Sequence, residues 1–318
     1  MLLYILRRIL WMIPIIIMIS FIIFTLMDLT PGTIIDTLDT SQMTPEQVAE
    51  VTSLYDLDKP LLYRYGKYMY NLMRGDIGVS VATGRSIWHD FARGFPYTVR
   101  LAFLSMAIGV AIAIPMGISA ARHAGSIWDT LTTGFTLLGM SMPTFWIGLL
   151  LIMLFSARLG WLPAVHTEGN ALSYIMPGIT GGLSMSATIT RQTRSVMLDV
   201  LRADYISTAQ AKGVSQRQII WKHALRNGWI PIITQIGLMM GHTLAGSAVV
   251  ETVYTWPGIG RLTVMAVSAR DATMACGLVI LTCILYVTVL LIVDILYAFA
   301  DPRIKAQYQS SRIRRRAG

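Results

Sequence analysis

Six apolar stretches without Lys, Arg, Asp or Glu divide the chain, and each is about as long as a helix that crosses a bilayer. Such a helix needs about 20 predominantly apolar residues. The six stretches are Ile9–Met27, Leu101–Ala121, Leu131–Ala157, Ala171–Thr190, Gly228–Val250 and Ala272–Val293. The fourth is rich in Gly, Ser and Thr, which favour close helix packing over contact with lipid. The pattern predicts an all-α polytopic membrane protein with six transmembrane helices.

The long polar segment between the first two stretches has a helical pattern of its own. Thr44-Pro45-Glu46-Gln47 has the spacing of a helix start, with Thr as cap and Pro at the first helical position. Pro60 begins a second helix with an apolar face. We therefore divide the chain into an N-terminus with the first transmembrane helix (1–29), an external helical subdomain (30–97), a five-helix transmembrane core (98–300) with a cytoplasmic loop (195–228), and a basic cytoplasmic tail (301–318).

Lys and Arg are concentrated on one side of the predicted spans. The termini and short loops on that side hold 16 of them, whereas the short loops on the other side hold 3. Cytoplasmic loops carry the excess of Lys and Arg in membrane proteins. The asymmetry predicts that both termini and the loop 195–228 are cytoplasmic. It also accounts for the net charge of +9, so membrane lipid and not nucleic acid is the expected environment.

The segment from Asp204 to Pro231 is predicted to form two short helices in the cytoplasm. Asp204 can cap the first helix, and Gly213 supplies the left-handed residue that ends it. Ser215 and Gln218 have the spacing of a capping box, so a second helix starts at once and is stopped near Pro231. By spacing alone, a basic loop that only sets membrane topology is an equal alternative.

An ordered set of motifs runs from the external subdomain to the end of the chain. It comprises Arg74-Gly75-Asp76-Ile77-Gly78, Ser141-Met142-Pro143-Thr144-Phe145-Trp146, Leu159-Gly160-Trp161-Leu162-Pro163, Ala211-Lys212-Gly213, His223-Ala224-Leu225-Arg226-Asn227, Trp256-Pro257-Gly258-Ile259-Gly260-Arg261 and Asp301-Pro302-Arg303. The set resembles the permease subunits of ATP-binding-cassette importers of the peptide/nickel (dipeptide/oligopeptide) family, of the first-permease type. Ser207 and Thr208 stand where the general superfamily motif has Glu and Ala, a departure that this branch tolerates.

The resemblance implies that the cytoplasmic loop is a coupling helix that docks on an ATPase subunit. The loop residues that match the family are Asp204, Tyr205, Thr208, Ala209, Ala211, Lys212, Gly213, His223 and Arg226. The implied partners are a second permease subunit in a heterodimer, two ATP-binding subunits and an extracytoplasmic substrate-binding protein, in a bacterial inner membrane. The implied function is half of a translocation pathway for dipeptides, oligopeptides or nickel chelates. No cofactor is expected on this chain, since ATP and Mg²⁺ would bind the partner ATPases.

Two other classes of protein are weighed against a permease. The phosphate-binding pattern G-x-x-x-x-G-K-[ST] is absent, so the chain itself is not expected to hydrolyse ATP. A secondary transporter that works without ATPase partners is the main alternative; such proteins usually contain related halves, and no repeat of that kind is evident. An intramembrane enzyme would need a nucleophile–base pair or a metal motif, and neither H-E-x-x-H nor C-x-x-C occurs.

Polar residues within apolar spans are candidate sites because they are costly in a bilayer. His242, with Met239 and Arg191, is a candidate for the translocation path, and a hydrogen bond between helices is the alternative for His242. Three residues near the predicted external turn after the fifth span are candidates for contact with a binding protein, with a local ion pair as the alternative: Glu251, Trp256 and Arg261. No metal site is predicted. The sequence leaves open which peptide or chelate is carried.

Overall fold

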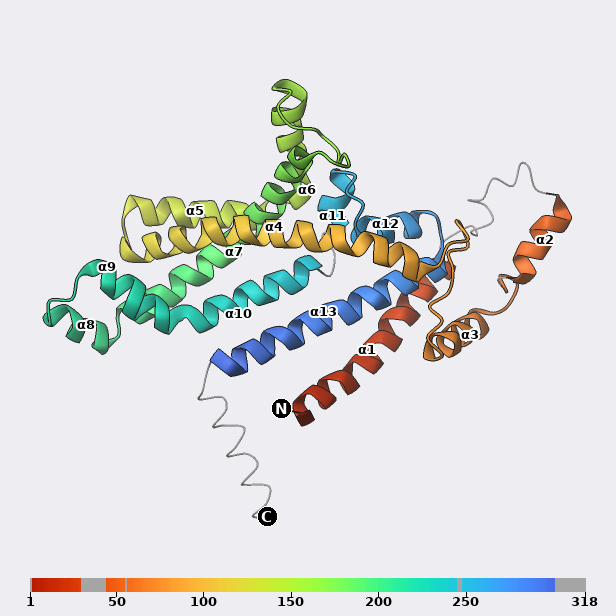
Figure 1. The fold of residues 1–318 in the computed structure, drawn as a ribbon, viewed down its shortest axis with the longest axis horizontal. Coiled ribbons are helices and arrows are strands. Elements are labelled where there is room, and N and C mark those ends of the chain that lie inside the picture. Colours follow the sequence, from red (N-terminus) through yellow and green to blue (C-terminus); the bar gives the residue numbers. More distant parts are fainter. Residues whose placement is uncertain (1, 30–43, 55, 245–247, 301–318) are drawn as a thin grey trace, which may run out of the picture. The chain divides into compact units, whose positions relative to one another are not determined.

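The computed structural model describes residues 2–29, 44–54, 56–244 and 248–300, and most of these residues are helical (Figure 1). Within these ranges there is no named strand, only an isolated bridge between Val79 and Ser86. The chain forms two compact units, residues 1–100 with 244–287 and residues 101–243 with 288–318. The predicted basic tail at 301–318 lies outside the described residues. The all-α fold class is therefore confirmed.

The first unit holds the helices predicted to be external and most of the last long helix. Its elements are α1 (Leu2–Leu29), α2 (Pro45–Leu54), α3 (Leu61–Met73), the first part of α4 (Ile87–Arg122), α11 (Ala248–Val253), α12 (Ile259–Ser268) and most of α13 (Ala272–Ala300). The helix α3 packs on α1, because the Tyr65 hydroxyl lies 3.0 Å from Ser20 Oγ and the ring meets Phe24 edge-on. Tyr68 and Cys276 are buried with Phe24 in the same cluster.

The second unit is built around α7, which is buried along most of its length. Its elements are the rest of α4, α5 (Ile127–Ser141), α6 (Thr144–Leu151), a π-helical segment (Ile152–Arg158), a 3-10 turn (Ala171–Tyr174), α7 (Ile175–Leu201), α8 (Asp204–Ala211), α9 (Gln216–Gln218), a second π-helical segment (Ile219–Ala224), α10 (Leu225–Leu244) and the end of α13. A Cβ on Gly182 of α7 would lie 2.7 Å from Ile108 of α4, so only glycine allows this approach. The prediction that the fourth apolar stretch is packed among its neighbours is confirmed.

The number of membrane spans stays a prediction. Among the residues described, two helices are long and apolar enough to cross a bilayer, Ile87–Arg122 and Ala272–Val293. A third results if α5 and the following helix Thr144–Arg158 form one span, although these two are bent by 101° relative to each other. Pro143 lies at this bend, where it precedes the first residue of α6. Helices also occupy the other three predicted stretches, but their described parts do not meet the same criterion.

The predicted helix start at Thr44 is confirmed, whereas the predicted helix end at Pro231 is wrong. The Gln47 amide donates to Thr44 Oγ1 (3.3 Å) and the Thr44 amide donates to Gln47 Oε1 (2.9 Å), which completes the predicted capping box. Pro231 was expected to end the second cytoplasmic helix, but it lies inside α10. Gly228 and Ile232, on either side of Pro231, are buried. Their packing stabilises the helix across Pro231, which has no amide hydrogen to donate.

Candidate functional site

The first helix of the loop predicted to be cytoplasmic, α8, is a short amphipathic helix with one buried side chain. Ile206 is 1% exposed and packs into the core of the second unit with Met197 and Ile219. Its neighbours Tyr205 and Thr208 are exposed. Ala203, not Asp204, occupies the cap position, and Asp204 is the first helical residue, where its negative charge is favourable for the helix dipole. One face of α8 is thus fixed to the core while the other is free to meet a partner.

Gly213 ends α8 in the manner that its sequence position predicted. Its φ is +77°, in the left-handed region that favours glycine. The Gly213 amide donates to Gln210 O (2.9 Å), and the Val214 amide donates to Ala209 O (3.2 Å). These two hydrogen bonds form a Schellman motif, which satisfies carbonyls at the end of the helix. Gly213 and Lys212 are exposed, so the turn itself lies on the surface.

The second helix starts at Ser215 and continues without a stop into α10. The Gln218 amide donates to Ser215 Oγ (3.4 Å), which confirms the predicted cap. The π-helical segment Ile219–Ala224 follows, with Ile219, Ile220 and Ala224 buried. Segments of π-helix are uncommon in proteins, and those that do occur often lie at functional sites. The chain therefore runs as one helical rod from the exposed turn into the predicted fifth span.

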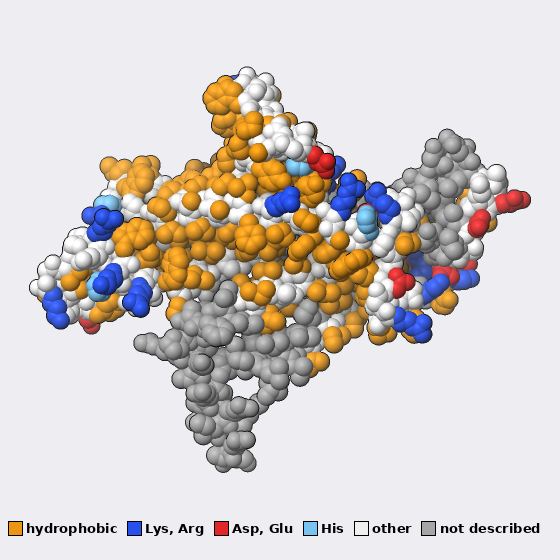
Figure 2. Space-filling view, viewed as in Figure 1, with side chains coloured by type: hydrophobic (Ala, Val, Ile, Leu, Met, Phe, Trp, Pro, Cys, Tyr) orange, Lys and Arg blue, Asp and Glu red, His pale blue; other side chains and the backbone are white. Residues whose placement is uncertain are grey.

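The matching residues of this loop form a surface with buried supports. Asp204, Tyr205, Thr208, Ala211, Lys212, Gly213 and Arg226 are exposed, whereas Ala209 and His223 are half-buried. Basic side chains gather over α8 and α9, at the left of Figure 2. The exposed basic residues of the loop are Arg202, Lys212, Arg217, Lys222 and Arg226. The arrangement suits docking on another protein.

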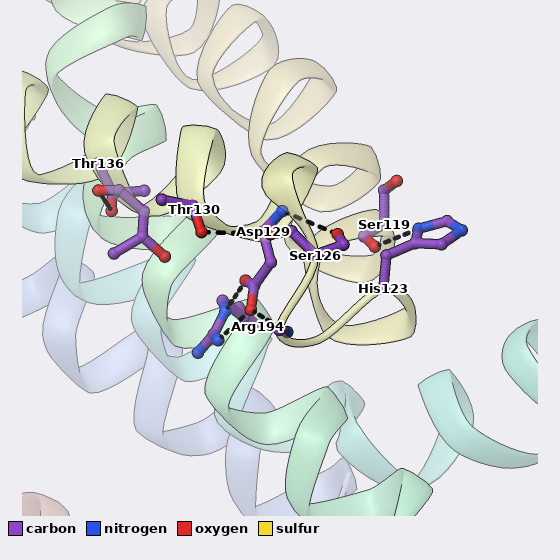
Figure 3. A network of polar contacts seen from close by, with 9 residues as sticks. Ser119, His123, Ser126, Asp129, Thr130, Thr136 and Arg194 are labelled. Atoms are coloured by element: carbon purple, nitrogen blue, oxygen red, sulfur yellow. Dashed lines mark hydrogen bonds and ion pairs between the residues drawn. The ribbon is translucent and has the colours of Figure 1, made fainter.

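An ion pair that the sequence reasoning missed joins α5 to α7 (Figure 3). Arg194 Nε lies 2.5 Å from Asp129 Oδ1, and its Nη2 lies 2.7 Å from Oδ2, so the contact is bidentate. The Gly125 amide also donates to Asp129 Oδ2 (2.9 Å), and the Asp129 amide donates to Ser126 Oγ (3.3 Å). Asp129 is 5% exposed. The pair holds α7 seven residues before its last residue, close in sequence to α8.

A sequence signal for part of this arrangement exists. Ser126 followed by Asp129 has the spacing of a helix cap with an acidic residue in the first turn, directly before the third apolar stretch. That spacing indicates where α5 starts but says nothing of Arg194, which is 65 residues away. Only the tertiary structure gives Arg194 its carboxylate partner.

The three candidates for the translocation path are not joined by a hydrogen bond or an ion pair in the described part of the chain. His242 is exposed on α10, while Met239 packs against the core of the second unit. Arg191 is exposed on α7. Among the described residues, no hydrogen bond of His242 to another helix is found. A role in the path stays a prediction.

The turn after the predicted fifth span is built around a buried carboxylate. Glu251 is 0% exposed; it accepts hydrogen bonds from Thr98 Oγ1 (2.8 Å) and from the Arg261 amide (3.0 Å). A Cβ on Gly258 would lie 2.4 Å from that carboxylate, so glycine is required there. Burial raises the pKa of the Glu251 carboxyl, and the hydrogen bonds from Arg261 and Thr98 oppose the shift.

This burial corrects the expectation of direct contact at the turn. Trp256 is also 0% exposed, and its indole Nε1 donates to Tyr97 O (3.0 Å). Neither Glu251 nor Trp256 reaches the surface, so neither side chain is placed to touch a docked protein. Arg261 is half-buried and contributes its backbone amide to Glu251. Glu251 and Trp256 instead fix the shape of the turn from within, and the alternative of a local Glu251–Arg261 ion pair is replaced by this backbone hydrogen bond.

Comparison with known proteins gives consistent matches along the chain. The family described as "Binding-protein-dependent transport system inner membrane component" matches residues 113–306, and its N-terminal counterpart matches residues 1–102. A di/tripeptide transport system permease protein of Pseudomonas aeruginosa (strain UCBPP-PA14) is 37% identical, with 96% of this chain and 100% of the relative covered.

Two further relatives and a solved structure agree with these matches. A dipeptide transport system permease protein of Escherichia coli (strain K12) is 36% identical over 96% of this chain and 99% of the relative. A glutathione transport system permease protein of Salmonella paratyphi A is 36% identical over 95% and 98%. An inward-facing structure of the MetNI methionine ABC transporter superposes with a TM-score of 0.57 at 17% identity, over 67% of this chain and 96% of that chain, and is similar in fold.

Proposed function

This chain belongs to the family of binding-protein-dependent inner-membrane transport components, and on that premise we propose that it is one of two permease subunits of an ATP-driven importer of short peptides. Its partners are a second permease, two ATP-binding subunits and an extracytoplasmic substrate-binding protein. ATP and Mg²⁺ bind the ATPase subunits, and this chain supplies half of the pathway. Short peptides are chosen because the matched relatives are named for dipeptides, tripeptides and glutathione. Nickel chelates have no such support.

One observation carries the coupling role: the loop at 195–228 is exposed yet rigidly supported. Its turn is closed by the Schellman motif at Gly213, and its two helices are anchored by the buried Ile206 and Ile219. Displacement of the exposed face of α8 by a partner should therefore also displace α7 and α10, because the loop between them is held by these contacts. ATP-driven closure of the ATPase subunits moves such loops together and shifts the permeases between inward- and outward-facing states, with ATP binding supplying the differential free energy.

ATP-dependent uptake tests this proposal. The chain is reconstituted in vesicles with its partner permease, both ATPase subunits and the binding protein, and uptake of a labelled dipeptide is followed. We expect uptake that needs both ATP and the binding protein. No ATP turnover is expected from the chain alone. If uptake without the ATPase subunits were as fast as uptake by the complete importer, the chain would be a secondary transporter.

Membrane topology gives a further prediction. The excess of Lys and Arg on one side predicts that the termini and the coupling loop are cytoplasmic and that the external subdomain is not. Cysteines placed at Ser53 and Ser215, both exposed, should react with an impermeant reagent from the outside and the inside, respectively. A cysteine at Ser310, outside the described residues, should react from the inside. Labelling of position 215 from the outside would contradict the assignment.

A further inference from the structure

Three exposed basic side chains form a row on the first part of α4, which the topology places outside. They are His89, Arg93 and Arg100, here called the external basic row. With 3.6 residues per turn, the three positions fall within a sector of about 40° and extend about 16 Å along the helix. Figure 2 shows blue and pale-blue side chains following one another along this part of α4. Arg93 and Arg100 thus form a positively charged strip on one face of α4, and His89 extends this polar row.

The charge of the two arginines in this row is not neutralised by an ion pair within the described residues. Arg85, just before α4, has a partner, since its Nε lies 3.2 Å from Asp90 Oδ1. The described part of the chain gives neither His89 nor Arg93 a hydrogen-bonding or ionic partner. Arg100 lies over the ring of Tyr97, with its Cζ 5.8 Å from the ring centroid, which leaves its charge in place. The row therefore adds no evident stability to the fold, and its charge is directed outward.

The position of the row along α4 favours a soluble partner over lipid. Arg100 directly precedes the apolar stretch Leu101–Ala121, so it lies at the level of the headgroups. The headgroup layer on one side of a bilayer is about 5–7 Å thick. At 1.5 Å per residue, Arg93 lies about 10 Å and His89 about 16 Å farther along the helix than Arg100. A tilt near 20° shortens these distances by only about 6%. Two of the three side chains thus extend beyond the headgroups.

We propose that the external basic row is a docking surface for an acidic face of the substrate-binding protein. The inference rests on the proposed function, because it requires an importer with a soluble partner outside the membrane. Opposite charges on two protein surfaces steer their encounter and raise the association rate, and salt weakens the effect. The buried Glu251 and Trp256 do not meet a partner directly, whereas the row presents unpaired charge at the surface.

The association rate tests the row directly. The complete importer is reconstituted in lipid nanodiscs, and binding of the purified, peptide-loaded binding protein is followed at low and at high salt. We expect Arg93→Glu to lower the association rate roughly tenfold at low salt and to flatten its salt dependence. The double variant His89→Glu/Arg93→Glu should show a larger loss. Dissociation rates should change little, since the charges act mainly before contact.

A matched control places the same charge reversal elsewhere on the outside. Arg158 is exposed at the end of the π-helical segment Ile152–Arg158, on the side that the topology makes external. Arg158→Glu should leave the association rate unchanged. ATP hydrolysis without the binding protein should be the same in all variants, which shows that they assemble. Should Arg93→Glu assemble poorly, Arg93→Gln replaces it and should lose part of the rate.

Two outcomes would overturn the proposal. The first is an association rate of Arg93→Glu equal to that of wild type at low salt. The second is an effect that occurs only in nanodiscs containing anionic lipid and vanishes in purely zwitterionic lipid, since the row would then bind headgroups. If either result is obtained while the wild-type importer takes up peptide normally, the docking proposal is refuted and the proposed function stands. Absence of uptake in the wild type would instead contradict the proposed function.

Discussion

Gly213→Val should assemble poorly with the ATPase subunits while reaching the membrane in normal amounts. A Cβ at a positive φ costs roughly 1–2 kcal/mol, and a β-branched side chain is strained further. No atom lies within 4 Å of the position that a Cβ on Gly213 would take, so the expected effect comes from the backbone and not from a clash. If docking requires the native angle between α8 and the following helix, a cost of about 1.4 kcal/mol lowers the affinity about tenfold. Pull-down of the ATPase subunits and peptide uptake at matched expression measure it.

Two control variants distinguish an effect of backbone strain at position 213 from an effect of backbone strain anywhere in the chain. Gly169 has the same φ of +77° and no atom within 4 Å of its would-be Cβ, but it lies in a loop predicted to be external. Gly169→Val should therefore carry similar strain and leave ATPase association unchanged. Gly213→Asn should stay near wild type, since Asn also occupies this position at the ends of helices. Lys212→Ala, which removes one exposed charge, should have a much smaller effect than Gly213→Val.

The coupling role of the loop depends on this result. Wild-type assembly and uptake by Gly213→Val would show that the segment only sets membrane topology, which is the alternative that spacing alone allows. A loss shared equally by Gly169→Val would point to general instability of the chain. Only a loss confined to Gly213→Val, and relieved in Gly213→Asn, supports a defined angle between the two helices.

Removing either side of the Asp129–Arg194 pair should reduce uptake per ATP hydrolysed. Arg194→Met leaves a carboxylate that is 5% exposed without its bidentate partner, at an expected cost of roughly 1–3 kcal/mol. Asp129→Asn weakens the same contact while keeping the shape of the side chain. Because the pair fixes α7 shortly before α8, the loop should be held less firmly, and ATP hydrolysis should become partly uncoupled from transport. The ratio of peptide uptake to ATP hydrolysis measures the effect.

A double-mutant cycle shows whether the two side chains act as a unit. The variant Asp129→Asn/Arg194→Met should be no more uncoupled than Arg194→Met alone, since both changes remove one interaction. Arg122→Ala serves as control, because Arg122 is exposed at the end of α4 near the same turn. It should keep the wild-type ratio. Strictly additive losses from the two single variants would contradict a shared contact.

Features that depend on neighbours along the chain were predictable from the sequence. The Thr44–Gln47 capping box, the Ser215 cap and the positive φ of Gly213 occur where their spacing placed them. Each is set by hydrogen bonds between residues at most five apart, so the choice of residue decides the local conformation. The same holds for the all-α class, because long apolar stretches leave the backbone few ways to satisfy its hydrogen bonds in a membrane.

Features that depend on packing were decided by the tertiary structure alone. Asp129 and Arg194 are 65 residues apart, and Glu251 and Thr98 are 153 apart. No local sequence pattern predicts contacts between residues so far apart in the sequence. Charged residues that the sequence suggests are exposed can therefore be buried or paired, as Glu251 and Arg194 are. Pro231 shows the same limit for helix ends: its ring disfavours a helix locally, yet α10 continues through it. The sequence alone thus determined where helices begin and which stretches are apolar, while tertiary contacts determined which polar side chains remain free to meet a partner.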